Sequence, residues 1–383
     1  MEMAMSDDLT FDDLGPQRAF HYYEPQSGMR ALLVIDTVQF RYSGGGLRML
    51  PDLSIGEIAL LARAMTYKFA WLDLNVGGAK AGIWFDANSQ DRRAVLRAFG
   101  EAAADLLQTR AYMCGVDMGT SHEDLDVVRA AAGLPEEADG LAARRLHGLT
   151  MEELVTGYGV IKSARRAAEM LGRSLDGASI ALEGLGKVGA GCLRQAREEG
   201  ARVVGVSTLA GTRFDANGLD VQALLALREE AGDESVVRYG DGQFMPKEAL
   251  YSLPADILIP GARTRCITAD VARAIQASLI VPAGNAPLTS EADAILYERG
   301  VTVVPDFVAN AGGVLLAVVG ALGGREQGAF DTVGERITAN TERALGEAKA
   351  RGVSPHQAAV AVARESLARR AQERPPGDPQ AKA

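Results

Sequence analysis

Two lysines have the sequence surroundings that acid–base chemistry requires. Only seven of the 40 basic residues are lysines, and a lysine, unlike an arginine, can lose its proton at workable cost. Lys80 lies in Gly-Gly-Ala-Lys-Ala-Gly, where flanking glycines would let a ligand approach the amine, and Lys68 ends an expected helix. Burial and a second cation would lower the pKa of such a lysine and make it a general base. Two surface lysines beside a flexible turn fit the spacing equally well.

An aspartate follows the next apolar segment of the chain. Asp117 stands in Gly-Val-Asp-Met-Gly-Thr, bracketed by Gly115 and Gly119. A carboxylate at a strand end can serve as a general acid or base. It can also cap a turn or helix, which is the commoner role of a single aspartate.

A third candidate is the segment Gly-Leu-Gly-Lys-Val-Gly, which follows an apolar strand and opens a helix. Gly184 would allow the tight turn, Gly186 would let the backbone approach a pyrophosphate, and Gly189 would let helix and strand pack closely. Lys187 and Val188 fill the two positions before the last glycine. Unpaired N–H groups at the helix N-terminus would face the phosphates, so the segment predicts a dinucleotide site.

The next strand ends without the acid that usually binds the ribose of NAD. Thr208 occupies that position, and Arg213 follows shortly. A carboxylate there accepts a hydrogen bond from the ribose 2′-hydroxyl. Because a threonine hydroxyl could serve either ribose, the sequence leaves NAD or NADP open as the cofactor.

The elements that position these residues indicate an α/β fold with two domains. We expect an N-terminal mixed α/β domain at 1–148 for substrate binding and oligomerisation, and a doubly wound, Rossmann-like domain at 149–329. Helices at 330–383 have no following strand and could pack on either domain. The expected strands are 31–38, 111–116, 179–182, 202–207, 256–259, 279–282 and 301–304, and the main helices are 54–69, 90–107, 151–171 and 188–199.

Composition narrows the classes of partner. The 383 residues carry a net charge of −10, with a pI near 5.1, which argues against nucleic acid or an anionic membrane. The three cysteines are far apart and the four histidines are unpaired in spacing, so we expect no metal site and a reducing, cytoplasmic location. No export segment or long apolar run is visible.

Taken together, these segments resemble the amino-acid dehydrogenase family, which comprises the glutamate, leucine, phenylalanine and valine dehydrogenases. The resemblance runs from about residue 27 to 324, and the order and spacing of the matching pieces are more specific than any one of them. The pieces are Gly44-Gly45-Gly46-Leu47-Arg48, Met65-Thr66-Tyr67-Lys68, Gly77-Gly78-Ala79-Lys80, Asp117-Met118-Gly119-Thr120, Thr156-Gly157-Tyr158-Gly159-Val160, Gly184–Gly189, and Pro305-Asp306-Phe307-Val308-Ala309-Asn310-Ala311-Gly312-Gly313-Val314.

The resemblance implies a role for each matching residue. Lys68 would bind the substrate α-carboxylate, Lys80 would activate water for attack on the imino carbon, and Asp117 would shuttle protons. Thr156 and Asn285 would line the cofactor site. The family likeness also implies an active cleft between the domains, last helices that return to the first domain, and a homo-oligomer, usually a hexamer or octamer. The ligands would be an amino acid, its 2-oxo acid and ammonia.

Two departures bear on the substrate. Glutamate-specific members have a lysine before Gly-Gly-Leu-Arg and a serine shortly after Gly-Gly-Val, whereas this chain has Gly44, followed by Gly45, and Ala317. We therefore expect an apolar substrate such as leucine, valine or phenylalanine, unless Arg48 or another cation rescues glutamate. The alternatives are a glutamate dehydrogenase with a diverged side-chain pocket, a non-catalytic regulatory subunit of the same fold, and a nucleotide-binding module unrelated to amino acids.

Overall fold

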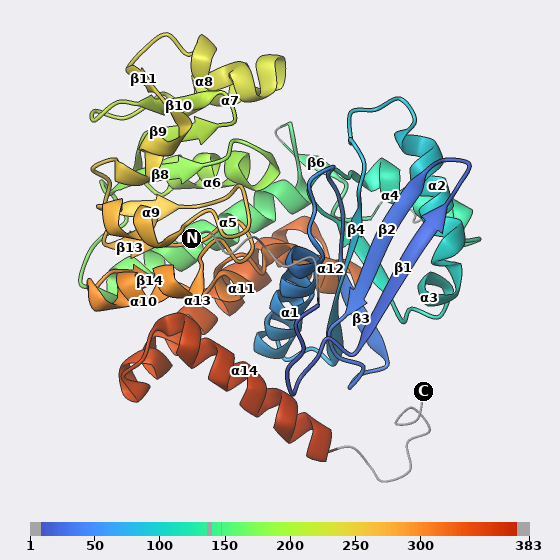
Figure 1. Cartoon of the computed structure of the whole chain (residues 1–383). Coiled ribbons are helices and arrows are strands. Elements are labelled where there is room, and N and C mark those ends of the chain that lie inside the picture. The colour runs from blue at the N-terminus through green and yellow to red at the C-terminus, as the bar shows by residue number, and fades with distance from the viewer. Residues whose placement is uncertain (1–8, 136–139, 147, 374–383) are drawn as a thin grey trace. The chain divides into compact units, whose positions relative to one another are not determined.

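A computed structural model describes residues 9–135, 140–146 and 148–373 (Figure 1). The chain divides into two compact units, one formed by 1–138 with 363–383 and the other by 139–362. The domain boundary expected at 148 lies ten residues beyond this division. Each unit has its own sheet and its own core.

The first unit is built on a mixed five-stranded sheet in the order β1-β2-β4-β3-β5. Strand β3 lies between β4 and β5 and is parallel to both, while β1, β2 and β4 are joined in antiparallel pairs. The bounds are β1 (Arg18–Glu24), β2 (Met29–Ile35), β3 (Tyr42–Met49), β4 (Val76–Ile83), β5 (Met113–Val116), α1 (Ile55–Trp71), α2 (Arg92–Ala102), α3 (Ala104–Gln108) and α4 (His122–Ala131).

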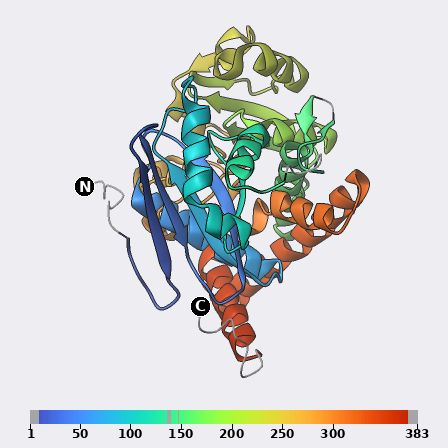
Figure 2. The ribbon, with the colours of Figure 1, turned by 90° about the vertical axis from the view of Figure 1, so that its right-hand side faces the viewer.

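The two faces of this sheet differ in character. On one face, α2 and α4 cover the sheet (Figure 2). Strand residues such as Leu47 and Met49 join Val95 and Phe99 in an apolar core on that face. On the other face, glycines let α1 lie close to the strands. A Cβ on Gly78 would lie 2.2 Å from the Ala62 carbonyl oxygen of α1. The glycines that spaced Lys80 in the sequence are therefore also needed for helix packing.

The second unit is built on a seven-stranded sheet in the order β11-β10-β9-β8-β12-β13-β14. Strands β9, β8, β12, β13 and β14 are parallel, and β10 and β11 extend the edge antiparallel. This arrangement confirms the predicted Rossmann-like sheet. The bounds are β8 (Ser179–Glu183), β9 (Arg202–Thr208), β10 (Gly211–Phe214), β11 (Gln243–Met245), β12 (Ile257–Ile259), β13 (Leu279–Ile280) and β14 (Thr302–Val303); a separate hairpin pairs β6 (Arg145–Leu146) with β7 (Leu149–Thr150).

Helices cover this sheet, and α5 packs against α6, α12 and α13. The helices are α5 (Met151–Met170), α6 (Lys187–Glu198), α7 (Val221–Ala231), η1 (Gly232–Glu234), α8 (Ser235–Arg238), η2 (Lys247–Ser252), α9 (Ala269–Ala274), α10 (Ser290–Glu298), α11 (Asp306–Ala309), α12 (Gly312–Ala321), α13 (Glu326–Arg351) and α14 (Pro355–Gln372). Within the described residues, no helix is long and apolar enough to cross a membrane.

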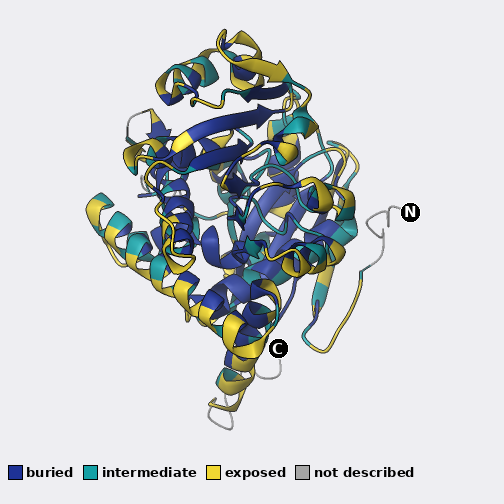
Figure 3. Ribbon diagram, turned by 90° about the vertical axis from the view of Figure 1, so that its left-hand side faces the viewer, coloured by how far each residue is buried: buried dark blue, intermediate teal, exposed yellow. Residues whose placement is uncertain are grey.

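The C-terminal helices are divided between the two units. The long helix α13 is buried along one side and exposed along the other (Figure 3). The buried side includes Val333 and Ile337, and the main helix contact of α13 is α5 of the second unit. The last turns of α14 belong to the first unit. There, Leu367 accepts a hydrogen bond from Gln39 at 2.8 Å, and Arg370 donates to the Leu74 carbonyl at 2.9 Å. Of the stretch 330–383 that was expected to return to the first domain, the structure groups 363–383 with it.

Candidate active site and cofactor site

The first unit brings Lys80 and Asp117 into direct contact. Lys80 lies on β4 and Asp117 directly follows β5, and β3 separates these two strands in the sheet. The Lys80 Nζ atom lies 2.6 Å from Oδ2 of Asp117, and both side chains are largely buried. A buried amine and a carboxylate at this distance can exchange a proton, which is the chemistry that their sequence surroundings favoured.

Arg48 and Glu57 extend this pair into a cluster of four charges. The Arg48 Nε donates to Asp117 Oδ2 at 2.9 Å, and its Nη1 donates to Glu57 Oε1 at 2.7 Å. Arg48 and Glu57 are only 3% and 1% exposed, so water screens neither charge. Two cations balance two anions, which is how a buried ionic cluster avoids an uncompensated charge. We refer to Arg48, Glu57, Lys80 and Asp117 as the four-charge cluster.

The cluster shifts the ionisation of its members. Burial, together with the Arg48 cation, lowers the pKa of Lys80, although Asp117 acts in the opposite direction. Burial alone would raise the pKa of Asp117, but Lys80 and Arg48 hold it well below the usual range. The neighbouring Cys114 does not supply a thiolate, because burial raises its pKa to about 12. The site thus contains a lysine whose neutral form is made more accessible beside a carboxylate that stays ionised.

Glycines around the cluster fall into two groups. A Cβ on Gly45 would lie 1.7 Å from the Ala79 carbonyl oxygen, so Gly45 is required for strand packing. A Cβ on Gly46 would lie 2.8 Å from the Asp117 Cβ and 3.2 Å from Lys80 Nζ, whereas a Cβ on Gly115 would have no atom within 4 Å. Space is therefore open beside Gly115.

Gly44 and Lys68 occupy other parts of the first unit's site region. A Cβ on Gly44 would lie 3.1 Å from the ring of Phe69 and 3.6 Å from the Met113 methyl group, so this position faces apolar side chains. Lys68 precedes Phe69 on α1 and is buried. Ala317 belongs to the second unit, where it lies exposed on α12.

In the second unit, the glycine segment forms the expected strand–turn–helix. Gly184 follows β8 with a φ of +87°, and Gly186 is the N-cap of α6 without a side-chain cap. A Cβ on Gly189 would lie 1.9 Å from the Gly184 carbonyl oxygen, so the helix could not approach the turn with a larger residue there. A Cβ on Gly186 would meet nothing within 4 Å. No protein atom therefore fills the space beside the backbone where α6 begins, directly before Lys187 and Val188, and a helix N-terminus of this kind favours a phosphate.

Thr208 and Arg213 are held by backbone groups. The Thr208 hydroxyl donates to the Asp233 carbonyl at 2.6 Å and accepts from the Ala210 N–H at 3.2 Å. The Arg213 guanidinium donates to three carbonyls of the segment 236–242, at 2.9 to 3.3 Å. Arg213 therefore fastens this segment to the sheet, and Thr208 tethers η1.

Thr156 and Asn285 lie in a region that also contains a residue the sequence interpretation did not single out. A Cβ on Gly313 would lie 3.3 Å from the Thr156 hydroxyl. The Asn310 amide donates to the Gly284 carbonyl at 2.9 Å and to Asn285 Oδ1 at 3.1 Å. Its own Oδ1 is buried with no hydrogen-bond partner among the described residues. In the sequence, Asn310 could have been noticed as a polar residue inside a glycine-rich apolar stretch.

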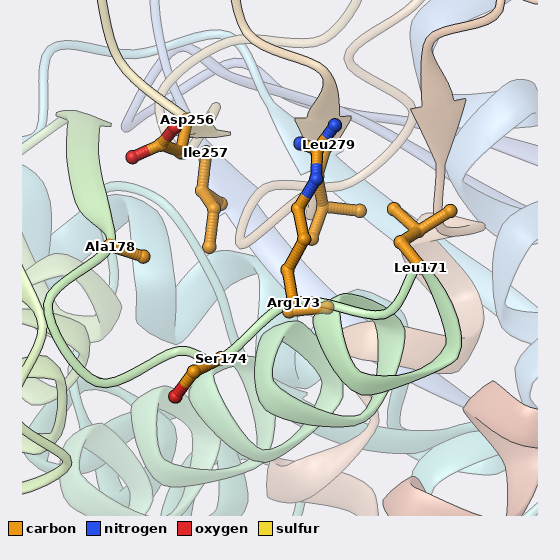
Figure 4. Close-up of a pocket in the computed structure, with 8 residues that line it drawn as sticks. Leu171, Arg173, Ser174, Ala178, Asp256, Ile257 and Leu279 are labelled. Carbon is orange, nitrogen blue, oxygen red and sulfur yellow. The ribbon is translucent and has the colours of Figure 1, made fainter.

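The second unit also has a cavity at the amino ends of its parallel strands, opposite the end at which the glycine turn lies. This cavity of about 160 Å³ is lined by residues that precede or begin β8, β12 and β13, including Ala178, Asp256 and Leu279, together with Arg173 (Figure 4). Because dinucleotides bind at the carboxyl ends of parallel strands, this cavity is not the cofactor site. Within 9–135, 140–146 and 148–373, no three acidic, histidine or cysteine side chains are grouped as metal ligands.

Comparisons with known proteins agree with this arrangement. Residues 148–374 match the family described as glutamate/leucine/phenylalanine/valine dehydrogenase, and 26–132 match its dimerisation domain. The chain is 30% identical to NADP-specific glutamate dehydrogenase A1 of Halobacterium salinarum over 79% of this chain and 74% of that protein. It is 34% identical to the glutamate dehydrogenase of Thermotoga maritima over 71% of this chain and 67% of that protein.

Solved structures show the same fold. The hetero-hexameric glutamate dehydrogenase of Thermus thermophilus, in a leucine-bound form, has a TM-score of 0.81 and 25% identity, covering 93% of this chain and 89% of that one. The L-tryptophan dehydrogenase of Nostoc punctiforme has a TM-score of 0.65 and 24% identity, covering 94% and 98%.

Proposed function

The chain belongs to the glutamate/leucine/phenylalanine/valine dehydrogenase family, and from that premise we propose that it deaminates an apolar L-amino acid reversibly. The products would be a 2-oxo acid and ammonia. The predicted family, the enzyme class and the use of NAD or NADP are confirmed by the comparisons. The amino acid and the roles of individual residues are our proposal.

One observation carries the assignment of roles, namely the buried contact between Lys80 and Asp117 at 2.6 Å. Burial and Arg48 lower the pKa of Lys80, so it can act as the base that activates water for attack on the imino carbon. Asp117 would shuttle the proton of the substrate amino group. A regulatory subunit without catalysis would need neither residue in this buried arrangement.

The remaining steps concern binding and the cofactor. Lys68 would pair with the substrate α-carboxylate through a charge-assisted hydrogen bond. When bound, the nicotinamide accepts the hydride that leaves the substrate carbon. Gly184, Gly186 and Gly189 fit a pyrophosphate, because the turn is tight and nothing fills the space that a side chain at Gly186 would occupy. Thr156, Asn285 and Thr208 would line the rest of the cofactor site.

The surroundings of Gly44 support the proposal that the substrate has an apolar side chain. A side-chain carboxylate brought into a buried pocket needs a cation, or its desolvation is costly. Position 44 offers no side chain and faces Phe69 and Met113. Arg48, the cation that could have rescued glutamate, is held by Asp117 and Glu57. Ala317 offers no polar group at the second position where the family resemblance expects one.

Glutamate remains the second candidate substrate, because the Halobacterium and Thermotoga relatives, at 30% and 34% identity, are glutamate dehydrogenases. A panel of 2-oxo acids with ammonia, run with NADH and with NADPH, separates the two. We expect kcat/KM for 4-methyl-2-oxopentanoate or phenylpyruvate to exceed that for 2-oxoglutarate by at least about 100-fold, because an unpaired buried charge is penalised far more than a missing methylene. A preference for 2-oxoglutarate would return the enzyme to the glutamate branch.

We also propose a homo-oligomer, with a hexamer or an octamer as the two alternatives. The Thermus relative is a hetero-hexamer, and the N-terminal match is described as a dimerisation domain, so both support assembly of several subunits. Light scattering after size-exclusion chromatography gives the subunit number directly, and a mass of 40.4 kDa would show a monomer.

A further inference from the structure

In the described residues, three helices begin with a Ser or Thr N-cap that is followed three residues later by an acid. The acid caps the helix in two of them but not in the third. In α4 and α5, the acid closes a capping box: Asp124 accepts from the Ser121 N–H, and Glu153 from the Thr150 N–H. In α1, Ser54 accepts from the Glu57 N–H at 3.1 Å, but the Glu57 side chain does not return the bond.

Glu57 instead turns its carboxylate to Arg48, with Oε1 at 2.7 Å from Nη1. Its second oxygen is buried and has no hydrogen-bond partner in the described part of the chain. A buried acceptor without a partner carries a free-energy penalty, so the local rule for a helix start is broken at a cost. Positions where local rules fail without local gain are characteristic of functional sites.

The contact places Glu57 one step behind the proposed acid–base pair. Arg48 uses Nη1 for Glu57 and Nε for Asp117, so one guanidinium bridges both carboxylates. Asp117 Oδ2 in turn contacts both Arg48 and Lys80. We propose that Glu57 is a positioning residue, which holds Arg48 on Asp117 and keeps the buried four-charge cluster neutral so that Lys80 can exchange its proton.

This inference rests on the proposed roles of Lys80 and Asp117. Without the Glu57 charge, the buried cluster would have a net charge of +1, which disfavours the protonated form of Lys80. The charged and titratable groups around Lys80 are Asp117, Arg48 and Cys114, and Cys114 in turn faces Tyr112 and Arg129; Lys68 is a further buried cation on α1.

The decisive variant is Glu57→Gln, which keeps the shape and removes the charge. We expect the acidic limb of the kcat/KM profile for deamination to move to lower pH by about half to one unit, because Lys80 becomes neutral at lower pH. Glu57→Ala should also lower the plateau kcat by roughly tenfold or more, since Arg48 is no longer held. Glu57→Asp keeps the charge, and its profile should stay where the wild-type profile lies.

A matched control is Asp36→Asn in the same unit. Asp36 is a buried carboxylate that accepts from Arg63 at 2.9 Å, and no contact joins it to the four-charge cluster in the described residues. We expect it to lower the Tm while leaving the pH profile unmoved. A shift in this control equal to that of Glu57→Gln would show a general effect of lost charge and overturn the proposal.

A second readout does not need turnover. Competitive labelling of lysines with acetic anhydride, resolved by mass spectrometry, gives the titration midpoint of Lys80, which should fall in Glu57→Gln. If the wild type turned over no amino acid while this midpoint moved, the proposed function would fail and the role of Glu57 in the cluster would stand. Unchanged midpoint and profile in Glu57→Gln, or a shifted profile in Glu57→Asp, would overturn the inference.

Discussion

The two units build their sites in opposite ways. In the second unit, six consecutive residues form the turn and helix start that we propose for pyrophosphate binding, and the key properties belong to the backbone. In the first unit, the four-charge cluster is assembled from β3, β4, α1 and the end of β5, and its key properties belong to side chains. A site made of local backbone is specified by glycine spacing, whereas a site made of distant side chains depends on the whole sheet.

This difference determines how each site should respond to mutation. In the cluster, each side chain compensates the charge of another, so truncating one leaves its partners uncompensated in a buried environment. In the glycine turn, added atoms are the hazard, because the chain passes close to itself. Truncation should therefore impair the cluster, whereas enlargement should impair the turn.

The largest expected effect is on catalysis by Lys80→Ala. If Lys80 activates water, turnover should fall by about 10²- to 10⁴-fold, since positioned acid–base groups contribute on that scale. Steady-state rates with the preferred 2-oxo acid and ammonia measure it, and NADH or NADPH binding followed by fluorescence should be unchanged. Near-normal turnover would remove Lys80 from the mechanism.

Lys68→Ala should raise KM more than it lowers kcat.

The glycine turn should show its effect in cofactor affinity. Gly189→Ala places a Cβ 1.9 Å from the Gly184 carbonyl oxygen, so α6 must move away from the turn. We expect dinucleotide affinity to fall by roughly tenfold or more, because the pyrophosphate depends on that helix N-terminus. Fluorescence titration with NADH and NADPH measures the loss.

Gly186→Ala is the matched comparison. Its Cβ would meet no protein atom within 4 Å, so the protein itself accommodates the methyl group. Weaker dinucleotide binding at unchanged Tm would show that the ligand backbone approaches this point. Full affinity in Gly186→Ala would place the pyrophosphate elsewhere.

The same contrast explains what could be predicted from the sequence. The GxGxxG segment could be assigned, together with its strand and helix, because glycine requirements are local. Lys80 and Asp117 were found as separate candidates, but their contact was not, since it depends on β3 separating β4 from β5. Glu57 was missed because Ser-x-x-Glu indicates a helix start, and only the fold shows the carboxylate turned away from it.

The later part of the chain shows a second limit. The helical pattern from 330 onward was visible, but which core it covers depends on apolar partners such as those of Val333 and Ile337, which no local pattern specifies. Arg213 was considered near the ribose because of its distance along the chain from Thr208. The structure holds it on backbone carbonyls of the segment 236–242, a contact that sequence spacing cannot reveal.

Acid should lower the stability of the first unit, because it protonates Asp117. The native pKa of Asp117 is depressed, so its contribution to stability is present above the ordinary pKa near 4 and is lost as the pH falls from there toward the native value. Asp117→Asn should lower the free energy of unfolding at pH 7 by about 3–5 kcal/mol, because Lys80 and Arg48 lose their shared partner. Urea unfolding at pH 7 and below pH 4 should show the gap to wild type narrowing in acid. A gap that widens would contradict the assigned charges.

The smallest expected effect is on cofactor choice. Thr208→Asp introduces a carboxylate at the end of β9, where an acid can accept from a ribose 2′-hydroxyl and repel a 2′-phosphate. The existing hydroxyl donates to the Asp233 carbonyl, and a carboxylate there cannot do so, which should lower the Tm and turn the new group away from η1. We expect the ratio of kcat/KM for NAD over NADP to rise by a few-fold, on the scale of one hydrogen bond.

Thr208→Val removes the same donor without adding charge, so it should share the loss in Tm and leave the ratio near wild type. An unchanged ratio in Thr208→Asp would show that Thr208 tethers η1 without facing the ribose, and the adenosine end of the site would then be shaped by backbone alone, like the glycine turn beside it.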